Sequence, residues 1–272
     1  MTAVLSSPSR AEIAWAIEMN PIDFWRAALP HIPGARVYDG ADMLRFVTGI
    51  DFFPFNQILF LNMEGPNLEA RLDETIASMR ATGLPFICSI GPSTRPDGLA
   101  TLLESRSLSR TNSMPGMAIA LDALPPDHTP PGFAIERVRS IDDLYRWNSA
   151  YCAGFGMNDV AYKAFLALYS SVGFNHDKFR HYLGLLNGEP VASSLLFLGA
   201  GVAGVNAVGV APAARRQGIG SAMTLGPLRE AAATGYRVGT LYASALGAPV
   251  YRRLGFQDYF TVEQYALRPE QQ

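Results

Sequence analysis

Cysteine and lysine are scarce in this sequence, and charge of either sign is modest. Cys88 and Cys152 are the only cysteines, too few for a disulfide framework or a zinc site, and we expect two half-buried apolar thiols in a reducing cytoplasm. Lysine occurs only at Lys163 and Lys178. The sequence has 22 basic (Lys and Arg) and 24 acidic (Asp and Glu) residues in total. Nucleic-acid binders gain most of their affinity by neutralising phosphates, so the net charge of −2 argues against a nucleic-acid partner.

Signals for metal binding, secretion and membrane insertion are also weak. The four histidines lack the spacing and neighbouring acids of a ligand set, so no metal is expected, and the first residues do not resemble a signal peptide. The uncharged stretch 190–214 is long enough to cross a bilayer, but glycines interrupt it and Pro212 ends it. Two strands, 191–198 and 203–210, explain it better, so we expect a cytoplasmic protein with no membrane partner.

Length and proline content predict two domains. A chain of 272 residues with 49% hydrophobic and 17% charged residues can fold around ordinary cores, and its length suits two of them. Four prolines fall within residues 125–131, where neither a helix nor a central strand can form. We therefore expect an N-terminal domain over 1–124, a linker over 125–132 and a second domain over 133–272.

Hydrophobic periodicity predicts an α/β (α+β) protein with a mixed, twisted sheet flanked by helices. In the second half, strands are expected near 133–138, 181–186, 191–198, 203–210, 238–244 and 256–267, and helices near 140–153, 159–172, 217–233 and 249–254. In the first half, a helix over 68–82 precedes a strand over 85–90 and a helix over 97–105. Ala81-Thr82-Gly83 recurs as Ala233-Thr234-Gly235, each after a helix and before a strand, which favours a degenerate internal repeat.

The segment with the strongest chemical signal runs from Val208 to Ser221. A strand ends, a short loop carries two arginines, and Gly218 and Gly220 open a helix. Glycines let a ligand approach the backbone, and the first amides of a helix lack internal partners, so this start can bind a pyrophosphate. A Walker loop would need a lysine here, and the dinucleotide fingerprint would need a glycine where Met223 stands, so a nucleotide-dependent ligase or kinase is disfavoured.

The same segment resembles motif A of the GCN5-related N-acetyltransferases (GNAT), written Gln/Arg-x-x-Gly-x-Gly/Ala, through Arg215, Gly218 and Gly220. The run from Tyr251 to Phe256 is similar to the Tyr-x-x-Leu-Gly-Phe ending of motif B in that family. The resemblance covers about 133–267. It implies the acyl-CoA N-acyltransferase fold, and the whole chain resembles tandem members whose N-terminal half has lost its cofactor motif.

The resemblance implies acetyl-CoA as co-substrate and a set of binding residues. Backbone groups of the strand end would pair with the pantetheine arm, amides of the helix start would hold the pyrophosphate, and Ser244 would either contact the pantetheine or cap the next helix. The expected binding residues are Val208, Gly209, Val210, Arg215, Arg216, Gln217, Gly218, Ile219, Gly220, Ser221 and Ser244.

Tyr251 stands where family members carry the general acid that protonates the departing thiolate; packing in the core is the alternative role. The general base is not assigned, because 238–244 and 191–210 contain no acidic residue. Asp159, Asp258 and Glu263 are candidates that read better as surface charges, and a water chain could serve instead.

The acceptor is expected to be a primary amine of a small molecule or peptide. It would dock near Phe155, Tyr162 and Phe165, although aromatic residues at helical spacing are more often core. A non-catalytic acyl-CoA-binding regulatory module is the alternative function, favoured by the missing base and opposed by Tyr251. The N-terminal half could cover the acceptor pocket or form a homodimer surface, and the sequence leaves both open.

Overall fold

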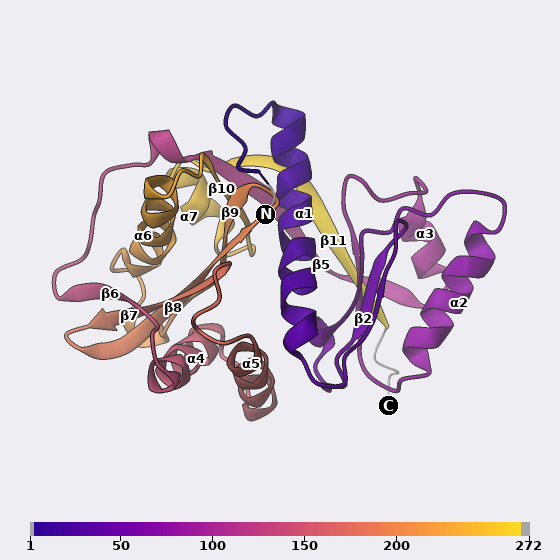
Figure 1. Cartoon of the computed structure of the whole chain (residues 1–272), viewed down its shortest axis with the longest axis horizontal. Helices are drawn as coiled ribbons and strands as arrows, with labels where there is room; N and C mark the ends of the chain where they lie inside the picture. The colour runs from indigo at the N-terminus through magenta and orange to yellow at the C-terminus, as the bar shows by residue number, and fades with distance from the viewer. Residues whose placement is uncertain (1–2, 268–272) are drawn as a thin grey trace. The chain divides into compact units, whose positions relative to one another are not determined.

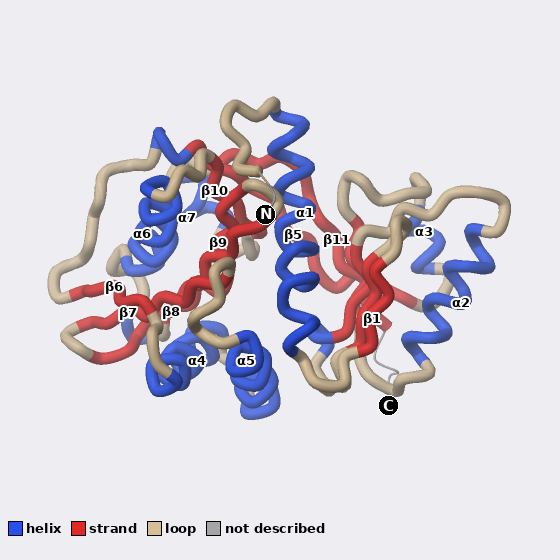
Figure 2. Tube along the Cα trace, in the orientation of Figure 1, coloured by secondary structure: helices blue, strands red, loops and turns tan. Residues whose placement is uncertain are grey.

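The computed structural model describes residues 3–267, with helices and strands alternating along much of the chain (Figures 1 and 2). The α-helices are α1 Arg10–Ala28, α2 Leu68–Arg80, α3 Leu99–Glu104, α4 Ile141–Phe155, α5 Asp159–Val172, α6 Ile219–Ala233 and α7 Ala248–Arg253. The strands are β1 Arg36–Asp39, β2 Leu44–Val47, β3 Asn56–Leu59, β4 Ile87–Ile90, β5 Leu108–Ala120, β6 Phe133–Arg137, β7 Phe179–Leu186, β8 Glu189–Gly199, β9 Val202–Val210, β10 Val238–Tyr242 and β11 Gln257–Leu267. The predicted α/β class with a mixed sheet is confirmed.

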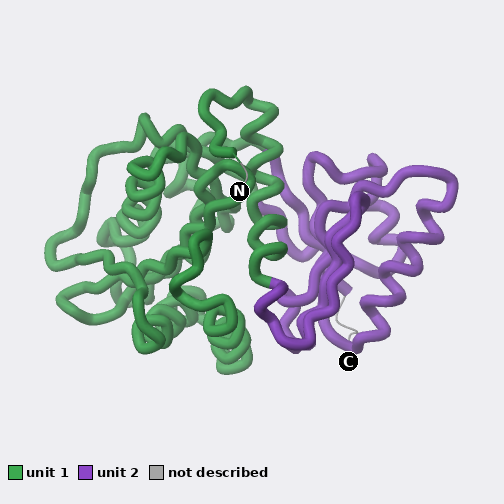
Figure 3. The backbone as a smooth tube through the Cα atoms, in the orientation of Figure 1, with its two compact units in different colours: residues 1–28, 115–259 green, residues 29–114, 260–272 purple. Residues whose placement is uncertain are grey.

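Two compact units divide the chain, at different places from the predicted domains (Figure 3). Unit 1 holds residues 1–28 and 115–259, and unit 2 holds residues 29–114 and 260–272. Residues 1–28 and 115–124, expected in the N-terminal domain, therefore lie in unit 1, and the end of the expected 133–272 domain lies in unit 2. The proline-rich segment 125–132 has neither helix nor strand, as predicted, but it lies inside unit 1.

The sheet of unit 1 has helices on both faces. Its strand order is β5–β10–β9–β8–β7–β6, antiparallel except for the parallel pair β9 and β10. Helix α4 lies on one face, where Trp147 Nε1 donates to the Ser194 carbonyl at 3.0 Å, and α1 joins it there through Phe24, which packs on Phe197. Helix α6 covers the other face (Figure 1).

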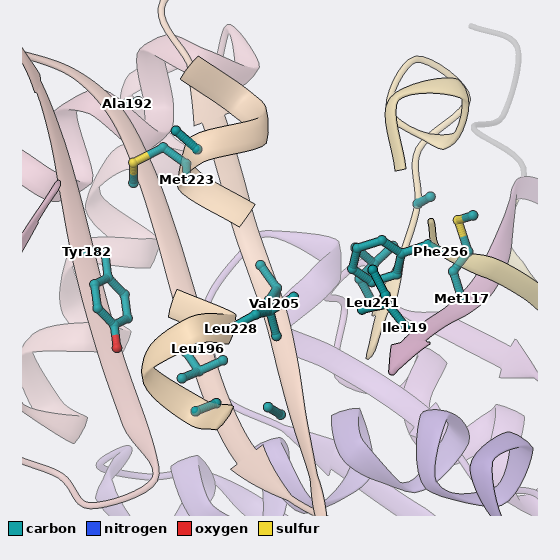
Figure 4. Close-up of a cluster of buried hydrophobic side chains, with 14 of the residues drawn as sticks. Met117, Ile119, Tyr182, Ala192, Leu196, Val205, Met223, Leu228, Leu241 and Phe256 are labelled. Atoms are coloured by element: carbon teal, nitrogen blue, oxygen red, sulfur yellow. The ribbon is translucent and has the colours of Figure 1, made fainter. Parts of the chain in front are cut away.

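The main core of unit 1 lies between this second face and α6. Its residues come mainly from β5 to β10, α6, α7 and the turn before β11. Figure 4 labels Met117, Ile119, Tyr182, Ala192, Leu196, Val205, Met223, Leu228, Leu241 and Phe256. Close packing requires small residues here, since a Cβ on Gly239 would approach Leu228 to 2.8 Å. The uncharged stretch 190–214 thus supplies two central strands, and no described helix is long and apolar enough to span a membrane.

Unit 2 repeats the pairing order of unit 1 in a smaller form. Its strands β1, β2 and β3 are antiparallel neighbours, β3 and β4 are parallel, and β4 is antiparallel to β11. Unit 1 shows the same succession through β7, β8, β9, β10 and β5. In both units the Ala-Thr-Gly triplet follows the helix (α2 or α6) that connects the two parallel strands, in agreement with the predicted repeat.

Each unit completes its sheet with a strand end that arrives from the other half of the sequence. Residues Gly116–Ala120, at the end of β5, pair with β10 in unit 1. Residues Glu263–Ala266, near the end of β11, pair with β4 in unit 2. The proline-rich segment therefore does not separate two self-contained sequence halves.

Candidate functional site

The end of β9 is built differently from the rest of that strand. Its register against β8 shifts between Ser193 and Leu195, and Ala207 takes a left-handed backbone conformation with φ 52°. The Ser193 hydroxyl donates to the Ala207 carbonyl at 2.9 Å and holds this bulge. Bulges re-aim backbone groups and are frequent next to active sites. The predicted binding backbone at 208–210 lies immediately after it.

Strands β9 and β10 part before this point. They pair at Ala203–Gly239 and Gly204–Thr240, and among the described residues β10 makes no further pair with β9, which continues to Val210. Backbone groups of 205–210 on that side therefore make no ladder pair with β10, and they include the predicted binding residues 208–210.

Helix α6 begins close to the end of β9. Its N-cap is Gly218, which has φ +82°, a conformation that suits glycine. A Cβ on Gly220 would come no closer than 3.7 Å to Val210 Cγ2, so the backbone is approachable there. The first turn of α6 carries no acidic residue, and its amides present the positive end of the helix dipole. Residues 216–221, called the cradle below, thus have the geometry of an anion-binding site.

Arg215 and Arg216 differ in what they do. The Arg215 guanidinium donates to the Val210 carbonyl at 3.1 Å and to the Gly154 carbonyl at 2.9 Å. It thereby ties the end of β9 to the end of α4, a positioning role that the motif did not reveal. Arg216 is exposed, with φ 67°, and is the first residue of the cradle.

Gly154, at the end of α4, has a packing role that the sequence did not predict. A Cβ there would fall 2.7 Å from the Val210 nitrogen, so only glycine lets α4 lie directly on β9. The neighbouring Phe155 lies across Gly209 and is half exposed, which places it beside the predicted pantetheine strand. Phe165, by contrast, is buried against Tyr151, with ring centroids 4.9 Å apart, and belongs to the core.

Tyr251 lies on α7, half-buried against the main core of unit 1. Its ring packs on Phe256 at 5.7 Å, and a Cβ on Gly247 would approach it to 2.9 Å. Burial raises the pKa of the Tyr251 phenol, and a hydrogen bond with Thr224 on α6 partly offsets the rise. The phenol is therefore protonated at neutral pH, as a general acid must be. Thr224 follows Gly220 by one helical turn, a spacing that could have pointed to it.

The remaining candidates from the sequence either have side-chain partners of their own or lie outside unit 1 or on its surface. Ser244 Oγ accepts a hydrogen bond from the Gly247 amide at 3.1 Å, which favours the helix-entry role over pantetheine binding. Asp258 forms an ion pair with Arg252 at 2.6 Å, and Glu263 lies in unit 2, paired with Arg110. Asp159 is exposed at the start of α5. Within residues 3–267 no cluster of three His, Cys, Asp or Glu side chains could hold a metal ion.

Comparison with known proteins agrees with this geometry. Residues 200–258, which contain the bulge, the cradle and α7, match the family model of the acetyltransferase (GNAT) domain. This part of the chain is therefore similar in sequence to GNAT acetyltransferases. No curated protein sequence matches the chain.

Solved structures extend the GNAT likeness to the whole fold. A GCN5-related N-acetyltransferase from Kribbella flavida superposes with a TM-score of 0.72 at 18% identity, covering 94% of this chain and 96% of that one. A GCN5-related N-acetyltransferase from Sphaerobacter thermophilus gives 0.62 at 19% identity, with 96% and 95% covered. A tandem GNAT protein from the clavulanic acid biosynthesis pathway gives 0.60 at 12% identity, covering 97% of each chain. The GNAT fold therefore spans nearly the full length.

Proposed function

We propose that unit 1 binds acetyl-CoA and transfers its acetyl group directly to a primary amine of a small molecule or peptide. The observation that carries the proposal is the parting of β9 from β10 beside the N-terminus of α6. A narrow opening between two strands suits an extended arm, and the adjacent helix start suits a diphosphate. Acetyl-CoA combines both features in one molecule.

Three groups of residues would bind and activate acetyl-CoA. Amides of 216–221 would bind the diphosphate, and the exposed Arg216 would add a cation. The backbone of 208–210 would pair with the amides of the arm and polarise the thioester carbonyl, as an oxyanion hole does. When the amine nitrogen attacks that carbonyl carbon and the carbon–sulfur bond breaks, Tyr251 would give its proton to the sulfur.

Coenzyme A binding and acetyl transfer test this proposal separately. Calorimetry with coenzyme A is expected to show binding that Gly218→Glu weakens at least about tenfold, because a carboxylate then faces the phosphates. Gly235→Glu is the matched control: Gly235 follows the other end of α6, also at positive φ (+100°) and with open space around it. Equal affinities of the two variants for coenzyme A would contradict the proposal that residues 216–221 bind the diphosphate.

Thiol release from acetyl-CoA, measured with a panel of primary amines, tests catalysis. Tyr251→Phe is expected to lower kcat about 100-fold or more while coenzyme A affinity stays unchanged. Binding without turnover across the panel would support the regulatory-module alternative instead.

A further inference from the structure

The proline-rich segment 125–132 lies inside unit 1 and does not link two domains. Proline restricts the backbone, so a segment with this many prolines is extended and semi-rigid. Residues 126–129 are exposed and belong to no helix or strand. A stiff, exposed segment of this kind can form a fixed wall for a ligand if both of its ends are held and a binding site lies beside it.

Both ends of the segment are held by hydrogen bonds within unit 1. At its start, the Arg229 guanidinium near the end of α6 donates to the Pro125 carbonyl. At its end, the Gly132 carbonyl accepts from the Asn187 amide, in the turn between β7 and β8, at 2.8 Å. A Cβ on Gly132 would overlap the Asn187 side chain, so glycine is required for this close approach. The segment is therefore anchored on two different elements.

Between these anchors the segment runs along α6 toward the cradle. Pro125 lies at Arg229, whereas a Cβ on Gly218, the N-cap of α6, would lie 3.7 Å from Pro130 Cγ. The helix rises by about 16 Å from residue 218 to residue 229. Residues 125–130 cover about the same distance when they are extended, so they have the reach to follow α6 to its start. Figure 1 shows the loop before β6 passing α6 in this way.

The cradle lies between the end of β9 and Pro130. A Cβ on Gly220 would face Val210 of β9, and one on Gly218 would face Pro130, each at 3.7 Å. In the proposed complex, the pantetheine arm leaves the diphosphate toward 208–210. The other substituent of the diphosphate is the nucleoside, and it therefore leaves on the side away from β9, where Pro130 lies.

The chemistry of the segment suits a nucleoside better than a phosphate. Its charged or titratable side chains are Asp127, which accepts a hydrogen bond from Thr129 Oγ1 at 3.1 Å, and His128. It therefore offers no concentration of positive charge. The ring of Pro130 is compact and apolar, so it can pack on a base or a ribose by van der Waals contact without leaving a hydrogen-bond donor unpaired.

We propose that the proline-rich segment forms a wall of the coenzyme A site and that Pro130 packs on the nucleoside end of the ligand, which rests on the proposed binding of acetyl-CoA. Pro130 then helps the site to select thioesters of coenzyme A over thioesters of phosphopantetheine. Because the segment is anchored at both ends, the wall is in place before the ligand binds, and little conformational entropy is lost on binding.

Calorimetry of the full chain with coenzyme A and with 4′-phosphopantetheine, which has the arm and one phosphate but no nucleoside, tests this proposal. The wild type is expected to bind coenzyme A at least about tenfold more tightly than 4′-phosphopantetheine. Pro130→Ala removes two ring methylenes and is expected to weaken coenzyme A binding about threefold or more, without changing the affinity for 4′-phosphopantetheine. Pro126→Ala is the matched control, because Pro126 is an exposed proline of the same segment and its loss also relaxes the backbone.

The outcomes distinguish this proposal from the proposed function. Absence of coenzyme A binding in the wild type would overturn the proposed function itself. Coenzyme A binding that is no tighter than that of 4′-phosphopantetheine would show that the nucleoside has no wall to contact. Equal losses of coenzyme A affinity in Pro130→Ala and Pro126→Ala, or equal losses for both ligands in Pro130→Ala, would overturn the contact between Pro130 and the nucleoside.

Discussion

His181 makes the stability of unit 1 depend on pH. It lies on β7 and is 1% exposed, between the rings of Trp147 and Tyr169, whose centroids are 4.8 and 5.0 Å away. Neither imidazole nitrogen has a hydrogen-bond partner among the described residues. Burial, with a smaller contribution from the charge of Arg137, lowers the pKa of His181 from 6.5 to about 3.

The size of the effect follows from this shift. Below pH 6.5 the unfolded chain binds a proton at His181 and the folded chain does not. The free energy of unfolding therefore decreases as the pH is lowered from about 6.5 to about 3. Each pH unit in this range costs about 1.4 kcal/mol. Between about pH 7.5 and pH 5.5 the folded state should therefore lose about 1.4 kcal/mol through this side chain alone.

Urea unfolding at these two pH values measures the loss. His181→Phe keeps an aromatic ring between Trp147 and Tyr169 but cannot titrate, so its pH dependence should be smaller than that of the wild type by about 1.4 kcal/mol. His128→Gln, at an exposed position in the proline-rich segment, should behave as the wild type does. If wild type and His181→Phe lose the same stability between the two pH values, the reasoning about this buried ring is wrong.

Three further variants probe the site and its scaffold. Gly218→Ala should lower the free energy of unfolding in urea by about 1 kcal/mol, because Gly218 has a positive φ. Gly218→Asn should lower it less, since asparagine adopts that conformation more readily, and equal losses would contradict this account. Arg215→Met should lower stability by up to about 1 kcal/mol, because it removes two solvent-exposed hydrogen bonds that water then replaces in part. Arg216→Met should change stability by less than about 0.5 kcal/mol and instead weaken coenzyme A binding in calorimetry. A fragment of residues 133–272 should show no cooperative thermal transition by circular dichroism, because β10 loses the strand end 116–120; melting like the full chain would refute that dependence.

Local signals were sufficient for much of unit 1. The glycines at 199 and 201 correctly divided an uncharged run into β8 and β9, and Gly218 correctly marked the start of α6. These features depend on backbone conformation within a few residues, which glycine and proline report directly. Pro249 likewise indicated the start of α7, whereas Tyr251 was singled out only by the resemblance to motif B.

Long-range relations could not be obtained in this way. The side-chain contacts of Arg215 depend on where α4 ends in space, and the motif carries no information about that. Helix α1 contains Pro21 within its span, and the sequence analysis assigned no element there. Asn20 of this helix contacts Gly199 and Gly204, residues far apart from it in sequence, so no local pattern indicates this packing.

The reciprocal use of β5 and β11 has a consequence for synthesis on the ribosome. Residues of β4 emerge early, but their partner at 263–266 is among the last of the described residues to be made. The end of β5 likewise waits for β10, more than a hundred positions later. Neither sheet can close while translation is in its first half, so nascent chains should expose open strand edges for most of elongation.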